Sequence, residues 1–119
     1  MLLLLHQGLF RAGILITLIV AGWGLISYLR RQPVSGGYRS TLVMTELVFV
    51  LQALVGVALL LSGARLRDGL HVLYGIVLIL VLPIAASYTA GRQRRREPLI
   101  FGLAGLFMVG LALRALMTS

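Results

Sequence analysis

The sequence predicts an all-α, integral-membrane four-helix bundle, because the composition is unusually apolar and four segments have the length of a membrane span. Hydrophobic residues make up 60% of the 119-residue chain and charged residues 12%, whereas a soluble domain is nearer half apolar and a quarter charged. One small core cannot bury that much apolar surface. The composition therefore excludes a soluble enzyme and a disordered chain.

The expected spans, in chain order, are residues 2–29, 41–61, 69–88 and 98–117. Each holds about the 20 mostly apolar residues that a helix needs to cross a bilayer. Apolar residues run on without the strict alternation that a membrane β-strand shows, and a helix satisfies its own backbone polar groups in lipid.

The segments between the spans justify where each helix begins and ends. The first span stops at Arg30, and the connection 30–40 contains Pro33 and two glycines. The second stops before the polar connection 62–68. The third stops before 91–97, and the fourth begins at Pro98, where a first-turn proline loses no helical hydrogen bond. Short connections favour antiparallel neighbours, so we expect an up-down-up-down bundle in one domain, residues 1–119.

The arginines predict the orientation in the membrane. All 11 basic residues are arginine and the net charge is +8. They sit between apolar runs, so they indicate membrane topology and not nucleic-acid binding. The connections 30–40 and 91–97 carry seven of them: Arg30, Arg31, Arg39, Arg92, Arg94, Arg95 and Arg96. Because basic residues are enriched in cytoplasmic loops, we expect a bacterial inner-membrane protein with both termini outside.

Three tyrosines fall near the cytoplasmic boundary that the arginines define. They are Tyr28, Tyr38 and Tyr88. Tyrosine is enriched where a bilayer meets water, so we expect these residues to form an aromatic belt.

Several catalytic chemistries are excluded by the residues that the chain lacks. There is no cysteine, which rules out disulfides, thiolate metal sites, iron–sulfur clusters and cysteine nucleophiles. The sequence has no H-E-x-x-H metal motif and no glycine-rich phosphate loop. We therefore expect no catalytic activity of the chain's own.

Ionisable residues inside membrane helices are costly and are functional candidates by default. His6 and His71 lie near the outer ends of the first and third spans, which point the same way in an up-down-up-down bundle. These spans are diagonal partners, about 12–14 Å apart if neighbouring axes are 8–10 Å apart. Two imidazoles reaching inward across that diagonal can ligate one iron, as in a bis-histidine haem b.

Neighbouring residues fit such a cofactor. Gly13 and Gly75 lie one or two turns deeper on the faces of the two histidines, where a flat macrocycle needs small residues. Arg65, Arg67 and Arg114 lie at the outer rim, where they could pair with the propionates. The alternatives are two interfacial histidines and glycines that serve helix packing. A zinc site would need three or four ligands, and the two histidines alone supply only two, so zinc is the less favoured metal.

Glu46 is the other intramembrane candidate. It lies about one turn into the second span. It is either an acid stabilised by the dipole at a helix N-terminus or part of a proton-linked site near a quinone.

Three short segments resemble small bacterial four-helix cytochrome-b-like membrane proteins. His6-Gln7-Gly8-Leu9-Phe10-Arg11 is similar to the H-S-G-L-R opening of that family, although its arginine falls farther from the histidine. The segment from Gln52 to Gly56 resembles the family's second-helix Gln-x3-Gly. Leu70-His71, its aliphatic helix and the arginines at 92–96 resemble the third helix. The resemblance implies that His6 and His71 are haem ligands.

Two functions stay open on the sequence. The first is a haem b-binding electron-transfer protein or redox-complex subunit, with a quinone or a larger redox complex as its partner. The alternative is a cofactor-free accessory subunit of a larger bacterial membrane complex. Both imply contact with the lipid bilayer and with other membrane subunits.

Overall fold

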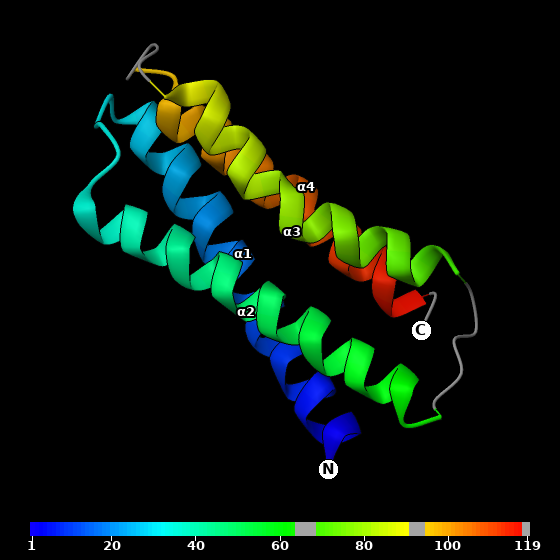
Figure 1. Cartoon of the computed structure of the whole chain (residues 1–119). Coiled ribbons are helices and arrows are strands. Elements are labelled where there is room, and N and C mark those ends of the chain that lie inside the picture. The colour runs from blue at the N-terminus through cyan, green and yellow to red at the C-terminus, as the bar shows by residue number, and fades with distance from the viewer. Residues whose placement is uncertain (64–68, 91–94, 118–119) are drawn as a thin grey trace.

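The computed structural model describes residues 1–63, 69–90 and 95–117, which form four helices (Figure 1). They are α1 (Leu2–Leu29), α2 (Gly36–Leu61), α3 (Leu70–Thr89) and α4 (Glu97–Met117). All four are long and apolar enough to cross a membrane. The predicted all-α class with four such helices is confirmed, and the helices indicate a multi-pass membrane protein.

Helix α2 begins at Gly36, five residues before the expected start at residue 41. Ser35 is the reason, because its hydroxyl oxygen accepts a hydrogen bond from the Tyr38 backbone N–H at 3.1 Å. A serine in this N-cap position satisfies a backbone donor that the helix itself leaves free. The cap therefore extends the helix through two glycines that the composition assigns to the connection.

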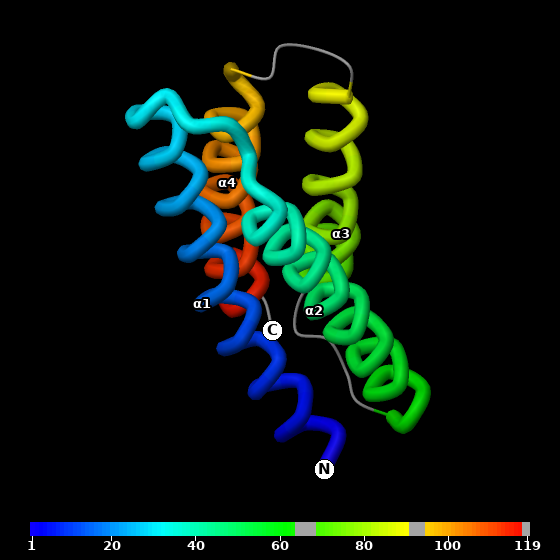
Figure 2. Tube along the Cα trace, turned by 90° about the vertical axis from the view of Figure 1, so that its left-hand side faces the viewer, coloured from blue at the N-terminus to red at the C-terminus, as the bar shows by residue number. Residues whose placement is uncertain are grey.

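Each helix packs against two others, so the four helices form a ring in the order α1, α2, α3, α4 (Figures 1 and 2). Helix α1 packs against α2 and α4, and α3 packs mainly against α4 and less extensively against α2. Helices α1 and α3 do not pack on each other and lie across a diagonal. Contacts along α1 and α2 run in opposite directions, since Gly13 lies against Phe49 while Trp23 lies beside Gly37. These two helices are therefore antiparallel.

Small residues bring α1 and α4 into backbone contact. A Cβ atom added to Gly102 would lie 2.9 Å from the backbone nitrogen of Leu25, and one added to Gly105 would lie 2.9 Å from that of Ala21. On α1, a Cβ at Gly24 would lie 2.8 Å from the Gly102 Cα. We call Ala21, Gly24, Gly102 and Gly105 the glycine seam. Such close approach is a common way for helices to associate in membranes.

Tyr38 lies in the interior of the bundle and not in an aromatic belt, so the expectation for this residue was wrong. Only 2% of it is exposed. Its hydroxyl donates a hydrogen bond of 2.8 Å to the Val20 carbonyl oxygen, and its ring meets those of Trp23 and Phe101 edge-on. The early start of α2 places Tyr38 in the first helical turn, from which it reaches α1. Tyr88, in contrast, is 60% exposed.

Buried polar residues are largely satisfied within their own helices. The hydroxyls of Thr17, Thr45 and Thr89 donate to carbonyl oxygens four residues earlier. Glu97 forms an ion pair with Arg39 at 2.7 Å, which joins the starts of α2 and α4. In a low-dielectric interior such partners are needed, because an unpaired polar group is costly there.

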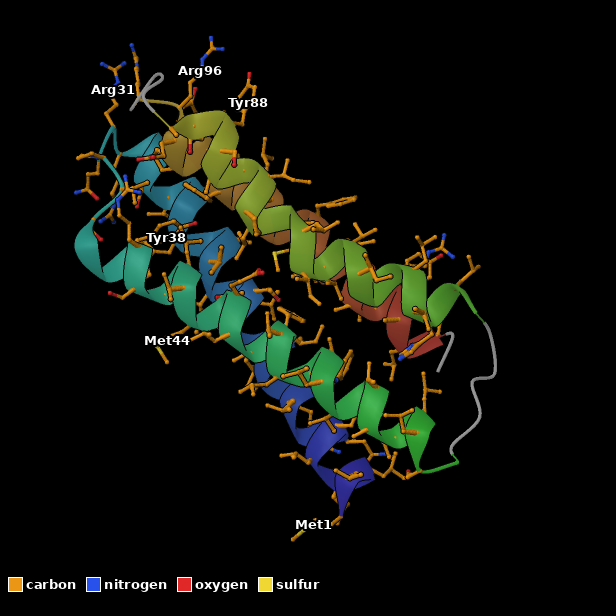
Figure 3. All side chains as sticks on the ribbon, in the orientation of Figure 1. Met1, Arg31, Tyr38, Met44, Tyr88 and Arg96 are labelled. Carbon is orange, nitrogen blue, oxygen red and sulfur yellow. The ribbon has the colours of Figure 1, made fainter. Side chains whose placement is uncertain are left out.

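The outward faces of all four helices carry large apolar side chains (Figure 3). Leu15, Leu54, Ile84 and Phe107 are each more than half exposed. A monomeric protein in water rarely exposes this much apolar surface. The outer surface therefore suggests contact with lipid.

Candidate functional site

His6 and His71 meet at one end of the bundle, although they are 65 positions apart in the sequence. Their ring centroids are 6.2 Å apart and the ring planes are inclined by 61°. His6 lies in the second turn of α1 and His71 in the first turn of α3. Because these helices do not pack on each other, the two side chains bridge the diagonal. We call this end of the molecule the histidine end.

The His71 ring is oriented by helix α4. Its Nδ1 lies 2.8 Å from the backbone carbonyl oxygen of Ala115. Ala115 is a buried residue. A carbonyl oxygen only accepts, so Nδ1 carries the hydrogen and donates it. In the neutral ring, Nε2 then holds a free lone pair. This is the usual arrangement of a histidine that ligates a metal, in which the second nitrogen is anchored by a hydrogen bond.

The His6 ring is seated against helix α2. A Cβ atom at Gly56 would lie 3.4 Å from the Cε1 atom of His6, at ordinary van der Waals distance, so the ring lies beside the helix at this residue. The Nδ1 of His6 is buried and has no hydrogen-bond partner in the described part of the chain. The same is true of Oε1 of Gln52, one turn from Gly56. A buried polar atom without a partner calls for an explanation, such as a ligand or an ion.

All four helices thus contribute to the histidine end, and two of the contributors were missed by the sequence analysis of the site. Gly56 was noted only as part of the Gln-x3-Gly segment, whose four-residue spacing puts Gln52 and Gly56 on one helix face. Ala115 acts through its backbone carbonyl, and no side-chain pattern signals such a contact.

The two glycines expected to flank a macrocycle have different surroundings. No atom lies within 4 Å of a Cβ built on Gly75, so there is open space beside α3 one turn from His71. A Cβ on Gly13 would lie 2.9 Å from the Phe49 ring, which packs against this part of α1. A macrocycle could approach Gly13 only if the Phe49 ring moved. In the present packing, Gly13 serves the contact between α1 and α2.

The arginines proposed for the propionates are only partly described. Arg65 and Arg67 lie outside the described residues. Arg114 lies in the last turn of α4, is exposed, and directly precedes Ala115. Arg114 is therefore at the histidine end, where the rim was expected. Arg11 is exposed on α1, five residues after His6.

Glu46 belongs to a different part of the bundle. It lies ten residues before Gly56, which is about 15 Å along a helix. Since α2 starts at Gly36, Glu46 is in the third turn, beyond the first turn in which the helix dipole acts. The helix-terminus explanation is therefore wrong for this residue. Its Oε1 is buried and has no partner among the described residues.

Among the described residues, no group of three or more histidine, cysteine, aspartate or glutamate side chains could hold a metal ion. Comparison with protein-family models, curated proteins and solved structures gives no match to this chain. The resemblance to small cytochrome-b-like proteins stays a prediction from short segments.

Proposed function

We propose that the protein is a multi-pass protein of the bacterial inner membrane that binds haem b through His6 and His71 and transfers electrons. The observation that carries this proposal is the approach of the two rings to 6.2 Å, together with the hydrogen bond between His71 Nδ1 and Ala115. The two rings reach each other from α1 and α3, whose backbones do not pack on each other, and the hydrogen bond holds the His71 ring from α4.

The spacing of the histidines supports a shared iron. Two metal–nitrogen bonds of about 2 Å each put the ligating nitrogens about 4 Å apart. Each ring centre lies roughly 1 Å beyond its nitrogen, so the centroids of two axial imidazoles are expected about 6 Å apart. The observed 6.2 Å agrees with that value. The mutual twist of two axial rings is free, so an inclination of 61° is compatible with it.

The residues around the rings have defined tasks in this proposal. When bound, haem supplies a one-electron iron couple whose potential depends on its axial ligands and surroundings. Ala115 orients His71 through its carbonyl, and Gly56 borders the His6 ring. Gly75 leaves space beside α3. Arg114 is a cation at the rim suited to a propionate, a role also proposed for Arg65 and Arg67.

The membrane arrangement is part of the proposal. We propose that α1 to α4 cross the bilayer in an up-down-up-down order with both termini outside. The arginines support this orientation, because seven lie at one side, six of them in the connections and Arg39 near the start of α2, and four lie at or near the other side. The natural electron partner is a quinone or another membrane subunit. Glu46, with its buried and unpaired oxygen, is the candidate for a proton-linked role.

A reporter fused to the C-terminus tests the orientation. An enzyme that is active only outside the cytoplasm, such as alkaline phosphatase, is expected to be active after residue 119. A reporter that requires the cytoplasm should be inactive there and active when inserted in the connection 30–35. The opposite pattern would reverse the topology and move the histidines to the inner side.

A reduced-minus-oxidised absorption spectrum tests the haem. We expect the protein purified from haem-replete cells to show a sharp α band of low-spin haem b at about one haem per chain. A featureless spectrum would favour the second candidate, a cofactor-free accessory subunit. The packing of Phe49 against Gly13 is the observation that favours this second function.

A further inference from the structure

The end of the bundle opposite the histidines carries a cluster of exposed arginines. Helix α1 is followed by Arg30 and Arg31, and α4 is preceded by Arg95 and Arg96. All four are exposed. Figure 3 shows Arg31 and Arg96 projecting beyond the same end of the molecule. We call these four residues the arginine cluster.

The register of the glycine seam brings the two arginine pairs to one level. Along the seam, Ala21 meets Gly105 and Gly24 meets Gly102. Continuing by six residues in each helix direction reaches Arg30 on one side and Arg96 on the other. The two pairs therefore lie close to each other, one at the end of α1 and one at the start of α4, although 65 positions separate them in the sequence.

The backbone of Arg31 adopts a left-handed conformation, which is less favourable for arginine than for glycine. Helix α1 ends in a Schellman motif, with hydrogen bonds from the N–H of Gln32 to Ser27 and from the N–H of Arg31 to Tyr28. Arg31 has φ of 56°, and among the described residues it is the one non-glycine residue with positive φ. Glycine is the usual residue at this position because it has no Cβ to strain. An outlier of this kind points to a role for the side chain.

The cluster has little compensating negative charge. The chain has three acidic residues. Glu97 is paired with Arg39, Glu46 lies well inside α2, and Asp68 lies outside the described residues. No ion pair involves the arginine cluster within the described ranges 1–63, 69–90 and 95–117. The four guanidinium groups at the adjoining ends of α1 and α4 could therefore bind an external anion.

We infer that the arginine cluster binds the phosphate groups of anionic phospholipids. The planar guanidinium donates two parallel hydrogen bonds to a phosphate, which makes arginine well suited to this group. Lipid is favoured over free phosphate because exposed apolar side chains lie at the same end of the bundle as the cluster (Figure 3). Leu29 is 78% exposed and Tyr88 60%. A phospholipid would use both surfaces, whereas a free phosphate would use only the arginines. The inference rests on the proposed membrane placement and is independent of the haem.

Lipid binding to the full chain in detergent, measured by native mass spectrometry, tests the inference. We expect phosphatidylglycerol to bind at least tenfold more tightly than phosphatidylcholine. Each arginine near a membrane surface contributes a factor of about five. Arg31→Gly should therefore weaken phosphatidylglycerol binding about fivefold, and Arg95→Gln with Arg96→Gln about 25-fold.

Two controls separate recognition from folding and from overall charge. Arg31→Gly relieves the strained backbone, so its midpoint of thermal unfolding in lipid-free detergent should be unchanged or higher. Arg11→Gln removes one exposed charge elsewhere on α1 and should leave lipid binding within about twofold. Equal binding of the two lipids, or an equal loss in Arg11→Gln, would overturn the inference. Competition by millimolar glycerol phosphate as effective as that by the lipid would overturn the lipid source. The haem spectrum and the reporter fusions report on the proposed function separately.

Discussion

Replacing either His6 or His71 by alanine is expected to abolish the low-spin haem b spectrum. In the proposed site both rings would hold the haem iron, and loss of either would leave it with one protein ligand at an end of the bundle. We expect bound haem to fall from about one per chain to less than about a tenth. The double variant should be no worse than either single variant, because the two ligands act as a unit.

Matched controls for this result are available on the same helices. Leu5→Ala and Leu73→Ala truncate exposed side chains close to the two histidines and should retain the spectrum. His6→Gly with added imidazole should recover part of the low-spin signal, since free imidazole can fill the vacated position. Independent, small effects of the two substitutions, each with its spectrum retained, would contradict a shared iron.

The second large effect is expected in the glycine seam. Gly105→Leu should prevent α1 and α4 from packing, because even a Cβ at this position would lie 2.9 Å from the Ala21 backbone nitrogen. A backbone atom cannot move aside as a side chain can. Overpacking by one methyl group costs about 1–3 kcal/mol, so Gly105→Ala is expected to lower the free energy of unfolding by that amount, and leucine by more.

Gly110 provides the control, since no atom lies within 4 Å of a Cβ built there. Gly110→Ala should be neutral or stabilise the helix by up to about 1 kcal/mol. Gly13→Leu should be less harmful than Gly105→Leu, because Gly13 faces the far end of the Phe49 side chain and not a backbone. Thermal unfolding in detergent measures these variants. Equal stability of Gly105→Ala and Gly110→Ala would remove the seam as the basis of packing.

The spans and their approximate limits followed from the sequence because hydrophobicity and length alone decide whether a helix can cross a bilayer. Three predicted helix starts lie within one residue of those observed, and the fourth differs at Gly36. That difference comes from one hydrogen bond of Ser35, a local contact that composition does not weigh. The same early start explains why Tyr38 is buried and not interfacial.

The candidate site was likewise predicted in part from the sequence and decided in part by the packing. The sequence pointed to His6 and His71 because an ionisable residue in an apolar helix stands out by its chemistry. It carried no information on which glycine faces the His6 ring or which carbonyl holds His71. Gly56, Ala115 and the Phe49 ring over Gly13 depend on helix rotation and register, which only the packing of four helices decides. Hydrophobicity places a helix in a membrane but leaves its rotation free, and close contacts between particular side chains and backbones set that rotation.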